Sequence, residues 1–103
     1  MQLLTPELRA QLPKLYTQET EKDPTVHIKF FTPDSSWTWY VTEGNANGED
    51  VEFFGFVVGL EREWGYFMLS ELESARGPLG LPIERDIHFT PRPFSEITRL
   101  ERL

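Results

Sequence analysis

The stretch Lys29-Phe30-Phe31-Thr32-Pro33-Asp34-Ser35-Ser36-Trp37-Thr38-Trp39-Tyr40 decides the fold, because it has the pattern of two aromatic strands joined by one tight turn. On both sides of the turn apolar residues alternate with more polar ones, which is the period-two pattern of half-buried strands. Proline, aspartate and serine supply the turn. We expect a hairpin whose inward face carries these side chains: Val26, Ile28, Phe30, Trp37, Trp39 and Val41.

The opposite face of this hairpin is the first place to look for a site. It carries Lys29, Phe31, Thr38 and Tyr40. If helices cover this face, its aromatic rings belong to the core, and if they do not, the rings are available to a partner. The covering of this face therefore decides between a structural and a functional interpretation.

The residues after the hairpin continue an antiparallel meander. Residues 44–50 are rich in asparagine and glycine, so we expect a loop there. Residues 51–60 are β-rich and largely apolar, which predicts a central strand covered on each side, and Gly55 within it indicates a bulge, a strong twist or the close approach of a neighbour. Residues 61–63 predict a turn, and residues 64–69 predict a fourth strand.

Two short helices are expected before and after this meander. Residues 6–12 have leucines at helical spacing, with Thr5 as the N-cap and Pro6 at the first helical position. Ser70-Glu71-Leu72-Glu73 fits the S-x-x-E capping box, in which serine and glutamate satisfy each other's free backbone N–H groups. The glycine and proline at 77 and 78 should end the helix that this box begins.

The C-terminal segment predicts a brief strand at residues 87–89 and a final helix. Ser95 is the expected N-cap of that helix, which places Ile97, Leu100 and Leu103 on one face against the sheet. Together these elements predict one α+β domain over residues 1–103. We expect a twisted antiparallel sheet of four or five strands with short N-terminal, middle and C-terminal helices.

The negative charge of the chain is concentrated in its middle. The net charge is −7, and residues 43–73 hold eight acids against one arginine. Residues 74–103 instead hold five arginines against four acids. An acidic field repels phosphate backbones, which argues against nucleic-acid binding through the middle of the chain. It suits the basic surface of another protein.

The aromatic residues outnumber what one face of a small sheet can bury. Exposed aromatics on a sheet serve as interface anchors or as platforms for base stacking, and the local acidity favours the interface. We expect a protein partner, with self-association as one form of it. The predicted partner-binding residues are Phe31, Tyr40, Glu49, Asp50, Glu52, Glu61, Glu63 and Trp64.

The alternative is a small nucleic-acid-binding module. Strand aromatics would stack on bases, and the late arginines would contact phosphates. The candidate phosphate-contacting residues are Arg76, Arg85 and Arg92.

An enzyme is not expected. The chain contains the residue types of a Ser-His-Asp site in His27, Asp34, Ser35, Ser36 and His88, but it lacks a G-x-S-x-G elbow, and turn chemistry already explains residues 34–36. The two histidines lie far apart in the sequence without the spacing of metal ligands. We therefore expect no catalytic residue, no cofactor and no metal.

The chain is expected to be cytoplasmic. It has no cysteine, which excludes disulfides and fits a reducing compartment. Its N-terminus has no basic region followed by an apolar run, and residues 53–60, the longest apolar run, are far too short to cross a bilayer.

Four blocks carry a resemblance to a known family: Leu3-Leu4-Thr5-Pro6-Glu7-Leu8-Arg9, residues 29–40, Gly65-Tyr66-Phe67 with Leu69-Ser70-Glu71-Leu72, and residues 76–86 with the sequence RGPLGLPIERD. Over nearly its whole length the chain resembles small bacterial proteins catalogued only as a domain of unknown function. The resemblance implies a setting on plasmids, phages and integrated elements, beside transfer and anti-restriction functions. The resulting expectation is a non-enzymatic, acidic protein-binding module, an accessory or anti-defence protein of a mobile genetic element that binds a basic or nucleic-acid-handling host protein.

Overall fold

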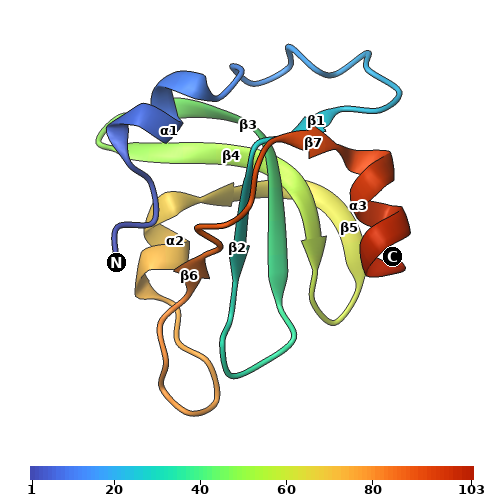
Figure 1. Cartoon of the computed structure of the whole chain (residues 1–103). Coiled ribbons are helices and arrows are strands. Elements are labelled where there is room, and N and C mark those ends of the chain that lie inside the picture. Colours follow the sequence, from blue (N-terminus) through green and yellow to red (C-terminus); the bar gives the residue numbers. More distant parts are fainter.

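The computed structural model describes all 103 residues around a five-stranded antiparallel sheet in the order β5-β4-β3-β2-β6 (Figure 1). The strands of this sheet are β2 (Ile28–Phe31), β3 (Thr38–Asn47), β4 (Asp50–Val58), β5 (Arg62–Met68) and β6 (Glu84–Arg85). A second, two-stranded sheet pairs β1 (Thr25–Val26) with β7 (Arg92–Pro93). The helices are α1 (Pro6–Gln11), α2 (Leu69–Ser74) and α3 (Phe94–Glu101). The α+β fold predicted from the sequence is confirmed.

The predicted hairpin forms from β2 and β3, with Phe30 opposite Trp39. Its turn is closed by a backbone bond of 3.0 Å from the Thr32 N–H to the Trp37 carbonyl, and the Thr32 hydroxyl accepts the Trp37 N–H at 3.1 Å. The expected inward face is wrong at both ends. Val26 belongs to the separate strand β1 and packs on the other side of the sheet, and the Trp37 ring is 37% exposed.

The connection between β3 and β4 is much tighter than predicted. Residues 44–50 are mostly strand, because Asn47 pairs with Asp50 and only two residues remain in the turn. The first of them, Gly48, has φ +62°, the positive value that a type II′ hairpin turn requires at this position. Asparagine and glycine thus mark a two-residue reversal here, not a longer loop.

β4 lies inside the sheet between β5 and β3, but β3 is the middle strand. Alternate side chains of β4 are only half-buried, so the expected covering on both sides is wrong. Gly55 marks a close approach, as predicted. A Cβ at Gly55 would overlap with the Tyr40 carbonyl of the neighbouring β3. The register shift itself lies on β3, between Val41 and Glu43. The turn after β4 comes earlier than expected, since Gly59 donates to the Glu61 carbonyl at 2.9 Å and β5 already begins at Arg62.

One side of the sheet, here called the first face, carries the main core. Its strand residues are Ile28, Phe30, Val41, Phe53 and Phe67. The N-terminal segment and α2 cover it with Leu3, Leu4, Leu12 and Leu72. Burying each such side chain contributes about 1.5–3 kcal/mol, so this layer supplies much of the driving force for folding.

The two early helices begin at different kinds of cap. α1 has the predicted cap, because the Thr5 hydroxyl accepts the Leu8 N–H at 3.2 Å. The predicted capping box of α2 is wrong in register. α2 begins at Leu69, and the Glu71 carboxylate accepts the Met68 N–H at 2.9 Å. Ser70 bonds to Asp50 instead, which ties α2 to the start of β4.

The C-terminal segment also differs from the prediction. Residues 87–89 are not a strand, because the pairing residues are Glu84–Arg85 before them and Arg92–Pro93 after them. α3 begins at Phe94, and Ser95 does not cap it but donates its N–H and hydroxyl to Asp23 at 2.8 and 2.6 Å. Of the three residues predicted on one face, Ile97 is buried and Leu103 packs against the same cluster, whereas Leu100 is 55% exposed.

Candidate functional site: an aromatic groove on the second face

The opposite side of the sheet, here called the second face, is covered only in part. Its strand residues include Tyr40, Glu43, Phe54, Phe56, Trp64 and Tyr66, which alternate with the first-face residues and pair across β3, β4 and β5. α3 packs on Tyr40 and Phe56 through Ile97 and Phe94. The remaining rings of β4 and β5 lie beside residues 15–24, here called the Tyr16 loop, and not beneath a helix.

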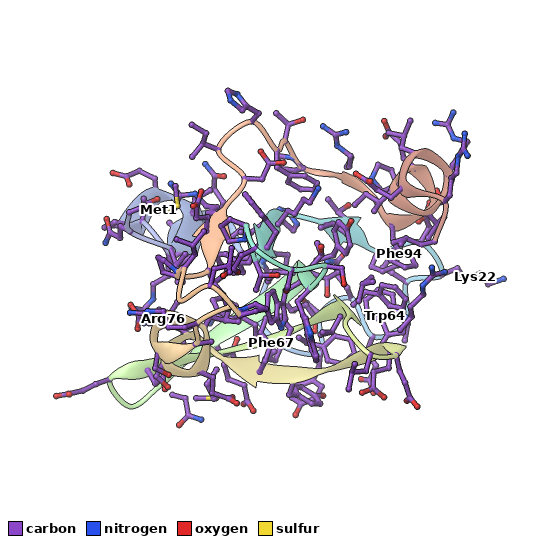
Figure 2. All side chains as sticks on the ribbon, turned by 90° about the horizontal axis from the view of Figure 1, so that it is seen from below. Met1, Lys22, Trp64, Phe67, Arg76 and Phe94 are labelled. Carbon is purple, nitrogen blue, oxygen red and sulfur yellow. The ribbon has the colours of Figure 1, made fainter.

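A cavity of about 420 Å³ lies between the second face, the Tyr16 loop and the start of α3. We call it the aromatic groove, because five of its lining residues are aromatic: Tyr16, Phe54, Trp64, Tyr66 and Phe94. Figure 2 shows Trp64 beside Phe94, with Phe67 of the first face in the interior. The groove thus joins three segments that are distant in sequence.

The rings of the aromatic groove form a continuous series. The Phe94 and Trp64 centroids are 4.7 Å apart, and Trp64 lies 5.7 Å from Phe54 with their planes within 12° of parallel. Phe54 is 4.9 Å from Tyr66, and Tyr66 is 6.4 Å from Tyr16. Trp64 is 39% exposed and Tyr66 52% exposed, so the groove offers ring faces to solvent although neighbouring rings hold each one in place.

Polar side chains of β3 hold the Tyr16 loop against the sheet. The buried Glu43 carboxylate accepts the backbone N–H groups of Tyr16, at 3.0 Å, and of Gln18. Asn45 accepts the Leu15 N–H at 2.8 Å, and the Gln18 amide donates to the Thr42 carbonyl at 2.9 Å. These bonds fix the wall of the groove before any ligand arrives.

Tyr16 has an unusual backbone conformation. Its φ is +72°, in the left-handed region that bulky residues rarely adopt. The bond from its N–H to Glu43 offsets part of that strain. Such strain persists where surrounding contacts over-determine a position, as is common at binding sites.

The charge around the aromatic groove is negative. Its lining contains three carboxylates, from Glu19, Glu21 and Glu43, against the single ammonium of Lys22. The two ion pairs of the structure both involve Lys29, so Glu19 and Glu21 have no cationic partner. In Figure 2 the Lys22 side chain extends away from Trp64 and Phe94.

The pKa of Tyr66 is raised, chiefly by its neighbour Tyr16 and to a smaller extent by the negative charge around it. The neighbouring Tyr16 hydroxyl raises the pKa of the Tyr66 phenol, and the charges of Glu43 and Glu19 raise it further. A phenolate is disfavoured near these groups, and for the same electrostatic reason a cation is favoured there.

The predicted partner-binding residues do not form one patch. Trp64 lies in the aromatic groove. Phe31 lines a separate cavity of about 520 Å³ with Lys29, Trp37 and His88. Tyr40 is only 3% exposed beneath α3, which corrects the expectation that its ring faces solvent on the open side.

The predicted acids are divided between the two ends of β4. Glu49, Asp50 and Glu52 lie near its start, whereas Glu61 and Glu63 lie in and after the turn at its far end. Asp50 accepts bonds from Ser70 and Val51, and the Ser70 hydroxyl is the main cause that lowers its pKa. The acids that line the aromatic groove are instead Glu19 and Glu21 of the Tyr16 loop and Glu43 of β3.

Trp64 is the one groove residue that was also a predicted partner-binding residue, and the residues that sequence reasoning missed include Tyr16, Glu19, Glu21 and Phe94. The polar Tyr16 loop had no pattern that distinguishes it from any surface loop, and Phe94 followed a proline-rich segment without periodicity. The one available signal was the Glu43 position, where a charged residue follows a run of strand residues. Its two loop contacts depend on a bulge that the sequence does not specify.

The candidate phosphate-contacting arginines have separate structural contacts. Arg76 donates to the Glu73 and Ala75 carbonyls at the end of α2, at 3.1 and 2.7 Å. Arg85 holds the N-terminal segment through the Gln2 and Leu3 carbonyls. Arg92 lies over the Phe89 ring at 5.1 Å. These contacts share no residue and do not gather the three guanidinium groups.

The Ser-His-Asp residue types are engaged elsewhere. The Asp34 carboxylate accepts the N–H groups of Leu79 and Leu81, at 2.8 and 3.3 Å, and its Oδ1 is buried without a hydrogen-bond partner. The Ser35 hydroxyl bonds to Thr32. Ser35 and His88 line the same cavity, but no hydrogen bond joins them. The arrangement does not assemble a nucleophile with its base.

The structure has neither a cluster of metal-ligating side chains nor a helix suited to a membrane. No group of three or more histidine, aspartate or glutamate side chains is placed to hold a metal ion. None of the helices has both the length and the apolar character needed to cross a membrane.

Comparison with known proteins gives the family of the chain. No curated protein and no solved structure matches it. A family model matches residues 3–101, nearly the whole chain. The chain therefore belongs to the family described as protein of unknown function (DUF2958).

Proposed function

We propose that this chain is a non-enzymatic module that binds another protein through the aromatic groove. The observation that carries the proposal is the combination, in one cavity, of five aromatic rings with the unpaired carboxylates of Glu19 and Glu21. Partly exposed aromatic anchors surrounded by polar groups are the usual energetic centres of protein interfaces.

The groove also has the rigidity that such a surface needs. Glu43, Asn45 and Gln18 fix the Tyr16 loop through hydrogen bonds to backbone groups, so little ordering is required when a partner binds. A pre-ordered surface avoids part of the entropic cost of association. This supports binding as the role of the groove.

The sign of the charge favours a protein over a nucleic acid. Carboxylates at the rim repel phosphates and attract lysine- or arginine-rich surfaces. The cavity that contains Phe31 is larger, but it mixes Lys29 and Arg85 with Glu84 and Asp86 and has no single sign. The aromatic groove is therefore the better candidate.

The finer part of the proposal concerns the setting. The resemblance stated above associates the family with mobile genetic elements, so we propose an accessory or anti-defence role in the cytoplasm of a bacterium. A basic host protein that handles nucleic acid would complement the acidic groove. The aromatic groove would bind the surface with which this host protein contacts phosphates.

Affinity capture with groove variants tests the proposal. The purified chain, a Trp64→Ala/Tyr66→Ala variant and a Leu79→Ala/Leu81→Ala control are each used to capture proteins from a bacterial lysate. Leu79 and Leu81 are exposed in the loop after α2, outside the groove. We expect a protein retained by the wild type and the control, and reduced at least about tenfold for the groove variant, as for the loss of interface hot spots.

The same capture experiment, with a nucleic-acid-binding assay beside it, can also contradict the proposal. The proposal is contradicted if the Trp64→Ala/Tyr66→Ala variant captures the same proteins as the wild type and the purified chain shifts the mobility of labelled DNA or RNA. A shift that falls steeply with salt and is lost in Arg85→Ala/Arg92→Ala would indicate the nucleic-acid-binding alternative. Circular dichroism on each variant verifies that it folds.

A further inference from the structure

We infer that the aromatic groove recognises an arginine side chain of its partner. The inference rests on the proposed function, because it names the chemical group that would enter the groove. The groove combines exposed ring faces of Trp64 and Tyr66 with carboxylates that lack a cation, and a guanidinium satisfies both kinds of surface at once.

The ring arrangement fits a planar cation lying on the ring faces. The near-parallel rings of Phe54 and Trp64 form one apolar surface, with Phe94 at one end and Tyr66 at the other. Their centroids are 5.7 Å apart, so these two rings contact each other and leave no slot between them. A guanidinium would therefore stack on the solvent-exposed side of this surface, where Trp64 is 39% exposed.

Two of the carboxylates that line the groove are available as acceptors for such a guanidinium. Glu43 has both oxygens engaged by the Tyr16 loop, so it contributes charge but not a free acceptor. Glu19 and Glu21 have no side-chain hydrogen bond and no ion pair, and both line the groove. They are free to accept from the fork of N–H donors that arginine presents.

Arginine fits these features better than lysine. The guanidinium is planar and weakly hydrated, so it stacks on rings at a small desolvation cost, whereas an ammonium is a compact and strongly hydrated charge. The chain's own Lys22 is consistent with this preference, since it lines the groove but extends away from Trp64 and Phe94 (Figure 2).

The three tryptophans make the inference directly measurable. Only Trp64 lines the aromatic groove, while Trp37 and Trp39 belong to the β2–β3 hairpin and stack on each other at 5.8 Å. In the 15N-labelled chain the three indole N–H resonances report the two regions separately. The probes are the capped tripeptides Gly-Arg-Gly, Gly-Lys-Gly and Gly-citrulline-Gly, each titrated to saturation. Citrulline keeps the shape of arginine without its charge.

We expect the arginine peptide to shift the Trp64 indole resonance and leave those of Trp37 and Trp39 in place. Citrulline should bind roughly 3- to 30-fold more weakly, the factor that a cation–π contact provides. A Glu19→Gln/Glu21→Gln variant should also weaken the arginine peptide, and a Glu73→Gln variant, which removes an exposed acid outside the groove, should not. The side chains of Glu19, Glu21 and Glu73 make no hydrogen bond in the structure, so both variants should fold like the wild type.

Two results would overturn the inference: equal or tighter binding of the citrulline or lysine peptide, or shifts confined to Trp37 and Trp39. The capture assay keeps the two proposals apart. If a protein is still captured through Trp64 while no peptide shows the arginine preference, the proposed function stands and the arginine inference fails. If the arginine peptide binds as expected but no protein depends on Trp64, the proposed function fails.

Discussion

A single buried carboxylate builds the wall of the groove. By sequence, Glu43 belonged to the acidic middle of the chain, but the structure leaves it 4% exposed and uses both oxygens as acceptors for the Tyr16 loop. The bulge between Val41 and Glu43 turns the side chain to this position. A residue that adds to the net charge thus acts as a structural acceptor.

Replacing Glu43 by glutamine should loosen the Tyr16 loop. Glutamine offers one acceptor oxygen in place of two, so one loop N–H loses its partner and the free energy of unfolding should fall by about 1–3 kcal/mol. Urea denaturation measures that loss, with Glu19→Gln as the control, expected within about 0.5 kcal/mol of wild type. Hydrogen exchange at the Tyr16 and Gln18 amides should accelerate. Unchanged exchange at both amides would show that Glu43 does not hold the loop.

A second residue-scale device is the contact between Gly77 and Asp34. A Cβ at Gly77 would overlap with the Asp34 carboxylate, whereas a Cβ at Gly65 in β5 would meet no atom within 4 Å. Gly77→Ala should therefore lower the free energy of unfolding by about 1–3 kcal/mol, as overpacking does. Gly65→Ala should be neutral or slightly stabilising. The two variants are compared by urea denaturation, and losses of the same size in both would refute the contact as the cause.

The Tyr40 phenol should make stability fall at alkaline pH. Burial under α3, and then the Glu101 charge, raise its pKa from 10.0 to about 12. The folded state keeps its proton after the unfolded chain has lost it, so stability is complete below pH 10 and declines as pH rises towards about 12. Tyr40→Phe should show a smaller decline of Tm over this range. If both proteins lose stability equally between these pH values, other groups account for the decline.

At the scale of elements, α3 decides which part of the second face stays open. Ile97 is 3% exposed and packs with Val26 and Tyr40, while Leu100, three residues later, is 55% exposed. The sequence pattern assigned both to one buried face. Phe94 anchors the start of α3 at Phe56 and Trp64. Leu103 packs against the same cluster as Ile97, so only Leu100 of the predicted face stays exposed.

Truncation to alanine should destabilise the fold strongly at Ile97 and very little at Leu100. Ile97→Ala should lower the free energy of unfolding by about 2–5 kcal/mol, because it removes a fully packed side chain. Leu100→Ala should change it by less than about 0.5 kcal/mol. Chemical denaturation of the pair measures both. A large loss in Leu100→Ala would mean that the helix packs as the sequence pattern indicated.

Elements specified by local chemistry were predictable, and elements specified by tertiary contacts were not. The hairpin around residues 32–37 and the Thr5 cap each rest on neighbouring residues, and both appear as expected. Ser70 and Ser95 also had local capping patterns, but distant carboxylates at Asp50 and Asp23 bind them instead. In both helices the N-cap is therefore two residues earlier than predicted, at Met68 and at Pro93.

At the scale of the whole molecule, the site is assembled from segments that no local pattern connects. The aromatic groove takes Tyr16 from a polar loop, Phe54, Trp64 and Tyr66 from two strands, and Phe94 from the last helix. From the sequence, the surplus of aromatics could be anticipated, and Trp64 was one of the predicted partner-binding residues. The acids could not, because Glu19 and Glu21 belong to a loop whose place beside the sheet depends on hydrogen bonds to Glu43 of β3.

Salt should act on the complex as a whole. If the groove attracts a basic partner, raising the ionic strength should slow association and weaken binding, because exposed charges are screened within about 10 Å at 0.1 M salt. Glu19→Gln/Glu21→Gln should bind more weakly at low salt and show a shallower salt dependence than wild type. Surface plasmon resonance with the captured partner measures both. Identical slopes for the two proteins would remove these acids from the interface.

Photo-crosslinking from inside the groove tests most directly whether the aromatic groove binds another protein. The photoreactive residue p-benzoylphenylalanine is placed at Tyr66, which is 52% exposed in the groove, or at Leu79, which is 81% exposed outside it. After irradiation in living bacteria, mass spectrometry identifies what is attached. We expect a defined protein to be crosslinked from position 66 and not from position 79. A crosslink to nucleic acid, or the same products from both positions, would contradict it.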